Sequence, residues 1–229
     1  MISNKLVTLS ALAFTFSYAH AAPLSTTEQK ASYAIGVDLA NNLQNQGIDI
    51  QVDSFLLGLE DSLKDNELKL TSEQMGESLD AFRASLEAKQ QAEQQALADQ
   101  NKKEGEAFLA KNKVKSDIKT LDSGLQYRVI EEGKGAHPTE NDTIIAHYKG
   151  TLLDGTEFDS SYNRNAPIEF KMDNVILGWQ EALKLMKPGS KWEIFVPAHL
   201  AYGMRGAGNV IGPNQTLIFE IHFISTAAE

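Results

Sequence analysis

Residues 143–161 read TIIAHYKGTLLDGTEFDSS, and this stretch says most about the fold. Its first part, Thr143–Thr151, is rich in β-branched and aromatic side chains and predicts a strand. The dipeptide Asp154-Gly155 is a strong turn signal, and it leads into a second strand predicted over Thr156–Phe158. The stretch therefore predicts two strands joined by a turn.

The remainder of the C-terminal half consists of similar short segments. No proline lies between Leu24 and His137, and the prolines that follow favour strands and turns in the second half. One short helix is predicted over Gly178–Met186, ended by Pro188-Gly189. Further strands are predicted over Leu125–Glu131, Pro167–Met172, Lys191–Val196 and Gln215–Ser225. We expect an α+β domain in which a curved antiparallel sheet wraps around one short helix.

The N-terminal half has the signals of helices. Ser25–Glu28 matches a capping box, in which the N-cap hydroxyl and the N3 carboxylate each pair with a free backbone N–H. The helix that follows is expected to end at Gly47. Asp53 is expected to cap a second helix, and another capping box at Thr71–Gln74 opens a third. The first half is therefore expected to be all-helical.

The predicted third helix changes character along its length. Its start carries one apolar stripe, formed by Met75, Leu79, Phe82 and Leu86. From Lys89 to Glu106 the residues are mostly strong helix formers with little to bury. A helix that is polar all round either bridges solvent or is unstable. We favour a helical spacer that reaches about Lys115, with a disordered linker as the alternative.

Two short helices and one apolar stripe form a thin core for an independent domain. Small domains bury too little surface to offset the conformational entropy of the chain unless they associate. We therefore expect this half to form a homodimer, in which each chain buries its stripe against the other. The alternative is that the helices pack on their own C-terminal domain.

The N-terminus has the features of a secretory signal. Lys5 is a positive start, Leu6–Phe16 is an apolar run, and Ala19-His20-Ala21 places small residues at the cleavage positions. The run is shorter than the ~20 residues that span a bilayer, and a membrane anchor is the alternative. We expect four parts: a signal peptide (1–21), a helical dimerisation domain (22–70), a long connecting helix (71–115) and the C-terminal domain (116–229).

Composition excludes several kinds of chemistry. The chain has no Cys, so disulfides, thiol nucleophiles and thiolate zinc sites are impossible. The formal net charge of −10 argues against a nucleic-acid partner. The sequence has no Walker loop, no serine nucleophile elbow and no pair of histidines at metal-site spacing among His137, His147, His199 and His222. We expect neither a metal nor a cofactor.

What remains is a set of aromatic and aliphatic residues with one isolated acid, Asp159. By default such residues would form a core. However, Val175-Ile176 directly precede the predicted short helix, so their backbone lies at an opening. The Gly-rich segment Ala201–Pro213 is also too long for a mere connection, and such loops often carry function. These two details favour a binding pocket.

Five ordered motifs resemble one known family. They are Tyr148-x-Gly150, Asp154-Gly155-x-x-Phe158-Asp159-Ser160-Ser161, Val175-Ile176-x-Gly178-Trp179, Leu200-Ala201-Tyr202-Gly203 and Thr216-Leu217-Ile218-Phe219-Glu220. Together they resemble the FKBP-type peptidyl-prolyl cis–trans isomerases. With its export signal and helical half, the whole chain resembles the Mip (macrophage infectivity potentiator) branch of that family.

The resemblance implies an isomerase without a cofactor. The implied catalytic residues are Tyr148, Phe158, Asp159, Tyr202 and Phe219. The implied substrate-binding residues are Arg164, Phe170, Val175, Ile176, Trp179 and Ile211, with Trp179 as the floor under the proline ring. The Ile176 N–H and the Tyr202 hydroxyl would hold substrate carbonyls. Asp159 would be held at the pocket edge by Tyr148 and Arg164, and a purely structural ion pair with Arg164 is the alternative.

Three positions depart from the family pattern. Leu177 stands where the family usually has Pro, Ile168 occupies a wall position that is often aromatic, and Ala207 lies where some relatives have His or Pro. These departures put loop shape and substrate preference in question more than activity.

The resemblance also implies partners and a location. Expected ligands are proline-containing unfolded or surface polypeptides and rapamycin- or tacrolimus-type macrolides. The protein is expected in the periplasm or on the outer-membrane surface of a Gram-negative bacterium, with chaperone-like client holding by the dimer and a role in virulence. One alternative is a non-catalytic chaperone or proline-peptide binding module. Another is an adhesion factor for a Pro-rich host ligand such as collagen.

Overall fold

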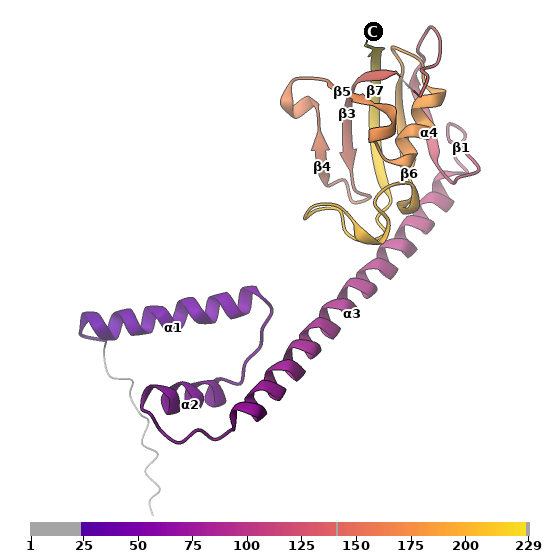
Figure 1. Cartoon of the computed structure of the whole chain (residues 1–229). Helices are drawn as coiled ribbons and strands as arrows, with labels where there is room; N and C mark the ends of the chain where they lie inside the picture. Colours follow the sequence, from indigo (N-terminus) through magenta and orange to yellow (C-terminus); the bar gives the residue numbers. More distant parts are fainter. Residues whose placement is uncertain (1–23, 141, 228–229) are drawn as a thin grey trace, which may run out of the picture. The chain divides into compact units, whose positions relative to one another are not determined.

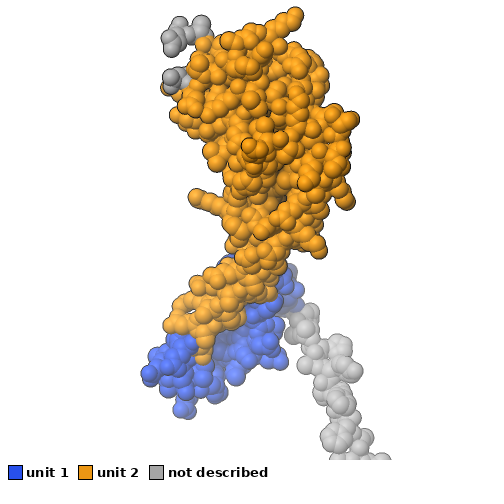
Figure 2. Space-filling view, turned by 90° about the vertical axis from the view of Figure 1, so that its right-hand side faces the viewer, with its two compact units in different colours: residues 1–77 blue, residues 78–229 orange. Residues whose placement is uncertain are grey.

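The computed structural model describes residues 24–140 and 142–227, which form two compact units divided between residues 77 and 78 (Figure 2). The predicted signal peptide over residues 1–21 lies outside the described residues. Within the described ranges, no helix combines the length and the apolar character that a membrane crossing requires.

The first unit contains α1 (Thr27–Asn45), α2 (Val52–Leu63) and the start of α3 (Ser72–Asn112). The capping box of α1 lies one residue later than predicted, on Thr26 and Gln29. The Gln29 side chain accepts hydrogen bonds from the backbone N–H groups of both Ser25 and Thr26. The N3 position of the capping box is therefore Gln29 and not Glu28.

The cap predicted for α2 on Asp53 is wrong. The helix begins at Val52, its N-cap is Gln51, and that residue makes no side-chain capping bond. Asp53 lies inside the first turn, where a negative charge still favours the helix through the positive end of its dipole. The acidic residue Asp53 therefore predicted the correct first turn of α2 but not the correct N-cap residue.

Helix α3 is continuous over 41 residues and about 60 Å long at 1.5 Å per residue. Its predicted capping box is confirmed, because Thr71 and Gln74 exchange backbone and side-chain hydrogen bonds of 2.9 and 3.2 Å. The polar middle stays helical, so the disordered-linker alternative is not what the structure has (Figure 1). Near its C-terminal end four residues are buried: Ala98, Asn101, Gly105 and Asn112.

The second unit contains one antiparallel sheet and the helix α4 (Leu177–Leu185). The strands are β1 (Lys119–Thr120), β2 (Gln126–Glu131), β3 (Thr143–Thr151), β4 (Glu157–Ser160), β5 (Ile168–Lys171), β6 (Lys191–Val196) and β7 (Leu217–Thr226). Their order is β1-β2-β6-β7-β3-β4, and β5 pairs with β3. The predicted α+β fold is confirmed, and the sequence pattern did not reveal the two-residue strand β1 or the short 3-10 turns between the strands.

The core of the second unit lies between α4 and the sheet (Figure 1). Strand β7 alternates as predicted, with Leu217, Phe219, Ile221 and Phe223 buried on one face. Helix α4 approaches β6 closely at Gly178, where a Cβ would lie 2.5 Å from a methyl group of Val196. This close approach holds the N-terminal end of α4 against the sheet, which places Trp179 beside β7.

Candidate active site

A cavity of about 490 Å³ opens between the start of α4, the inner face of β3, β4 and β7, and the long loop before β7. Its lining residues are mostly apolar: Tyr148, Phe158, Asp159, Ile168, Asn174, Val175, Ile176, Trp179, Tyr202, Ala207, Gly208, Asn209, Val210, Ile211 and Phe219. The size and lining are those of a small-ligand site.

Trp179 is the centre of an aromatic cluster around this cavity. Its ring meets Tyr148, Phe170 and Phe219 edge to face, with centroids 5.3, 5.6 and 5.3 Å away. Phe158 in turn meets Phe219 at 5.5 Å and an angle of 84°. Edge-to-face contacts are the favoured geometry for aromatic pairs, so they hold the buried indole from several sides.

Gly150 on β3 makes this cluster possible. A Cβ at this position would lie 2.5 Å from the ring of Phe158 and 2.9 Å from that of Phe219. The absence of a side chain therefore lets both rings lie directly against the strand, between the backbone and the cavity.

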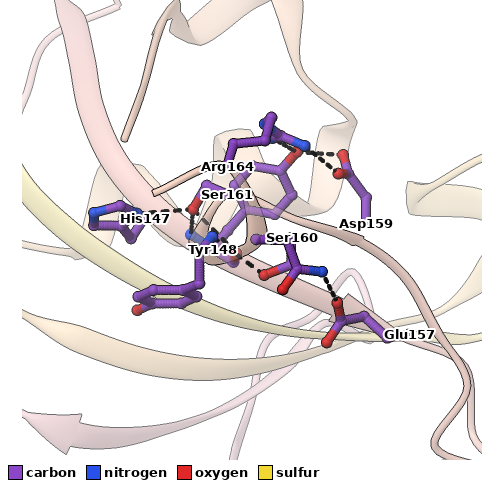
Figure 3. Close-up of polar contacts among 9 residues, drawn as sticks. His147, Tyr148, Glu157, Asp159, Ser160, Ser161 and Arg164 are labelled. Carbon is purple, nitrogen blue, oxygen red and sulfur yellow. Dashed lines mark hydrogen bonds and ion pairs between the residues drawn. The ribbon is translucent and has the colours of Figure 1, made fainter. Parts of the chain in front are cut away.

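The polar edge of the cavity is a triangle of Tyr148, Asp159 and Arg164 (Figure 3). The Tyr148 hydroxyl donates a hydrogen bond to one carboxylate oxygen of Asp159. Arg164 donates to the other oxygen at 2.7 Å and to the Tyr148 hydroxyl at 2.9 Å. The Asp159 carboxylate is thus fixed by two donors, although 44% of its side chain is exposed.

These contacts shift the ionisation of all three groups. Burial raises the pKa of Asp159, but hydrogen bonds from Tyr148 and Arg164 outweigh it, and the pKa is lowered overall. Burial and the bond to Asp159 raise the pKa of Tyr148. The bond to Asp159 raises the pKa of Arg164. At neutral pH the triangle therefore holds a carboxylate, a neutral phenol and a guanidinium.

The backbone of Tyr148 is anchored by Ser161, which is fully buried. The Ser161 hydroxyl accepts from the Tyr148 N–H at 2.8 Å and donates to the Tyr148 carbonyl at 3.2 Å. His147 contacts the same hydroxyl at 2.9 Å (Figure 3). The sequence analysis did not assign a role to Ser161, although its position at the end of the Asp159-Ser160-Ser161 motif was a usable signal.

Two potential donors face the cavity without protein acceptors. Neither the Ile176 N–H nor the Tyr202 hydroxyl makes a hydrogen bond within residues 24–140 and 142–227. Helix α4 begins at Leu177, directly after Ile176, and Leu177 itself points outward with 54% of its surface exposed. The departure from Pro at this position therefore leaves the start of the helix in place.

The structure brings most of the predicted site residues together. Nine of them line the cavity: Tyr148, Phe158, Asp159, Val175, Ile176, Trp179, Tyr202, Ile211 and Phe219. Phe170 and Arg164 lie one layer back, behind Trp179 and Asp159. The sequence analysis missed Asn174 as a lining residue, and it indicated Gly208–Val210 only as part of the Gly-rich loop Ala201–Pro213. The described residues hold no group of three or more acidic or histidine side chains suited to a metal ion.

Comparison with known proteins agrees with this geometry. Residues 134–224 match the model for FKBP-type peptidyl-prolyl cis-trans isomerase, and residues 28–129 match the domain amino terminal to it. Outer membrane protein MIP of Legionella longbeachae is 49% identical over 96% of this chain and 97% of its own length. Peptidyl-prolyl cis-trans isomerase Mip of Coxiella burnetii is 45% identical over 90% of both chains.

A solved structure supports the fold along almost the whole chain. FkpA from Escherichia coli superposes with a TM-score of 0.77 at 36% identity, covering 89% of this chain and 98% of its own. The match spans the helical half as well as the sheet. The chain therefore belongs to the FKBP-type peptidyl-prolyl cis-trans isomerase family.

Proposed function

We propose that the cavity above Trp179 accelerates cis–trans isomerisation of Xaa–Pro bonds. The observation that carries this proposal is a mostly apolar, aromatic cavity beside one fixed carboxylate and two donors that have no acceptor within the described residues. Rotation about the bond faces a barrier of ~18–20 kcal/mol, because amide resonance must be broken. The twisted transition state has lost this resonance and is less polar than the planar amide. An apolar pocket therefore favours it without a nucleophile or a base.

Each residue takes a part in this scheme. Trp179 carries the proline ring, and the aromatic and aliphatic walls are Tyr148, Phe158, Phe170, Val175, Ile176, Ile211 and Phe219. The Ile176 N–H and the Tyr202 hydroxyl hold the carbonyls on either side of the rotating bond. Asp159 places a negative charge beside the twisting amide, and Arg164 and Tyr148 keep it in position.

The first unit is proposed to form the homodimer. Within the described part of α1 no residue is buried, and in α2 only Asp61 is. Large apolar side chains are instead exposed along both helices, including Tyr33, Ile35, Phe55 and Leu56. Such surface in a small helical unit is normally buried by association. Residues 22–70 would then be the dimerisation domain, 71–115 the connecting helix and 116–229 the isomerase domain.

The dimer is proposed to work on exported polypeptides, in the periplasm or at the outer-membrane surface. Two pockets on one dimer raise the effective concentration of a site near a client that carries several prolines. The name of one relative, outer membrane protein MIP, supports the outer-membrane location, and the resemblance to Mip proteins is the ground for proposing a role in virulence. Macrolides of the rapamycin type would compete for the same pocket.

The test is the cis-to-trans relaxation of a short Phe-Pro peptide with the full chain. We expect acceleration that rapamycin abolishes and that Asp159→Leu lowers at least tenfold. Asp159→Asn keeps the shape and removes the charge. Glu157→Gln on the same strand is its matched control and should leave the rate unchanged.

The result also decides between the isomerase and the non-catalytic chaperone. If a folded wild-type protein leaves relaxation at the uncatalysed rate but suppresses aggregation of a denatured client, the chaperone is the correct function. If Asp159→Asn retains the full rate, the carboxylate is only the structural partner of Arg164.

A further inference from the structure

The C-terminal end of α3 packs on the sheet domain, where it contacts the loop that forms one wall of the cavity. Two polar side chains of this helix, Asn101 and Asn112, are buried, with 8% and 1% of their surfaces exposed. Buried amides are retained where they make hydrogen bonds, so each one marks a specific contact. The two contacts lead to different parts of the sheet domain.

Asn101 holds the end of the long loop that precedes β7. Its side-chain amide donates to the Pro213 carbonyl at 2.8 Å. The next loop residue, Asn214, reaches back to the carbonyl of Ala98 at 3.4 Å. A Cβ on Gly212 would also lie only 3.4 Å from the Asn101 amide nitrogen, so this turn of α3 lies directly against the loop backbone.

The other side of the same loop is a wall of the cavity. Ala207 and Ile211 pair through two backbone hydrogen bonds of 2.9 and 3.1 Å, and both line the cavity. The Asn214 N–H closes the loop on the Gly203 carbonyl at 2.8 Å. Gly206 has a φ of 64° and no room for a Cβ against the Ile211 carbonyl, so the loop is tightly packed inside. A shift at its Pro213 end is therefore passed on to Ile211.

We propose that Asn101 is a positioning residue for the isomerase reaction. It acts through the loop, because its bond to Pro213 fixes the Ile211 wall at the distance the proline ring needs. This inference rests on the proposed isomerase function for its kinetic effect. Its structural part, a loop ordered by α3, stands without that function.

Asn112 supplies a matched control on the same helix. Its amide donates to the side chain of Gln126 at 3.0 Å, and Gln126 donates to the Leu109 carbonyl at 2.9 Å. These bonds dock α3 on β2, which contributes no residue to the cavity. Asn→Asp places a carboxylate in a buried site at either position, more deeply at Asn112, but of the two only Asn101 touches the loop.

The experiment compares Asn101→Asp and Asn112→Asp in the full chain. In Asn101→Asp the carboxylate cannot donate to Pro213, and we expect kcat/KM for a short Phe-Pro peptide to fall about two- to tenfold, mainly through KM. Asn112→Asp should keep kcat/KM within twofold of the wild type. Amide hydrogen exchange over residues 203–214 should accelerate in Asn101→Asp and stay unchanged in Asn112→Asp.

A second variant tests the neighbouring contact between the loop and α3, the bond from the Asn214 amide, which also contacts the Met204 sulfur, to the Ala98 carbonyl. Asn214 has a φ of 54°, so Asn214→Gly removes its amide at no backbone strain and should shift KM in the same direction as Asn101→Asp. Equal exchange and equal KM in the two Asn→Asp variants would overturn the proposal. If the wild type lacks isomerase activity, the proposed function fails, and the exchange comparison alone decides whether α3 orders the loop.

Discussion

Asp159 is a carboxylate on an open rim that nevertheless keeps a defined position. Its two donors come from different elements, Tyr148 from β3 and Arg164 from the short 3-10 turn Tyr162–Arg164. Each donor lowers the pKa of the carboxylate, and together with the Arg164 charge and a backbone hydrogen bond from Ser160 they outweigh the effect of burial. The charge at this rim is therefore a property of the triangle and not of Asp159 alone.

The pH profile of activity follows from this triangle. The pKa of Asp159 lies below its ordinary value of 3.8, so the carboxylate contributes fully above 3.8 and is lost only as pH falls through the lower folded-state pKa. The pKa of Tyr148 lies above 10.0. We expect kcat/KM to be level around neutral pH and its acid limb to have a midpoint below 3.8. Peptide relaxation with circular dichroism at each pH measures this. An acid limb with its midpoint above 3.8 in a folded protein would contradict it.

Gly150 should be intolerant of even one methyl group. In Gly150→Ala the added Cβ overlaps the rings of Phe158 and Phe219 and displaces them toward the cavity. We expect a loss of about 1–3 kcal/mol in the free energy of unfolding and a kcat/KM lower by roughly tenfold. Urea denaturation and peptide relaxation measure the two effects. Lys149→Ala, an exposed neighbour on β3, is the control and should change neither.

Single residues of the site were predictable where a motif carried them. Tyr148, Asp159 and Trp179 belong to ordered motifs and lie at the cavity as expected. Asn174 and Val210 belong to no motif, and they reach the cavity only because the surrounding loops fold over it. Such placement depends on tertiary packing, which residue types and spacing do not encode.

At the scale of elements, α3 combines a solvent-exposed polar segment with a C-terminal end that packs on the sheet domain. Its polar middle needs no partner, but its end is buried on the sheet domain, where Phe108 covers Phe195 at 5.7 Å. The sequence pattern showed the loss of the apolar stripe after Leu86 and not the docking that follows. The buried residues of the docking face are Ala, Gly and Asn, and beside them Phe108 alone does not form a recognisable apolar pattern.

Two glycines on α3 should respond to alanine in opposite ways. A Cβ on Gly105 would lie 3.2 Å from Thr216 Cβ and closer still to its hydroxyl, whereas a Cβ on Gly76 meets no atom within 4 Å. We expect Gly105→Ala to destabilise the protein by about 1–3 kcal/mol. Gly76→Ala should stabilise the helix by about 0.5–1 kcal/mol. Thermal unfolding followed by circular dichroism measures both, and the same sign for both would refute the docking at Gly105.

At the scale of the whole molecule, the helical unit and the sheet unit differ in how far they bury their apolar side chains. The second unit buries a continuous core, whereas α1 leaves Ile35 and its apolar neighbours exposed. The expectation of a thin N-terminal core rested on counting apolar residues, and the burial of α1 and α2 agrees with that count. Which surfaces would meet in the proposed dimer could not be predicted, because the pattern of one chain does not specify the register of its partner.

The proposed dimer should be sensitive to one charge on α1. Ile35→Glu places a carboxylate on a side chain that is 68% exposed in the single chain. Burying an Ile side chain contributes ~1.5–3 kcal/mol, and losing this contribution should raise the dissociation constant of the dimer at least tenfold. Analytical ultracentrifugation measures this. Asn41→Glu adds the same charge at a polar position and should keep the dimer.

Two activity assays on the same variants distinguish the contribution of the helical unit from that of the isomerase pocket. A short Phe-Pro peptide engages one pocket, so Ile35→Glu should retain its kcat/KM. Refolding of a proline-rich protein engages both pockets of a dimer and should slow. A proportional loss in both assays would mean that the helical unit is needed for the fold of the pocket itself.

The two tryptophans of the chain lie in very different surroundings, and this gives the protein a built-in optical reporter. Trp179 forms the buried floor of the cavity, while Trp192 stacks flat on Tyr127 with centroids 4.3 Å apart. The sequence places no tryptophan in the helical half. With Trp192→Phe, all indole emission would come from the cavity floor. The binding kinetics of a peptide or macrolide could then be followed by tryptophan fluorescence without any attached dye, and the helical half would contribute no tryptophan signal.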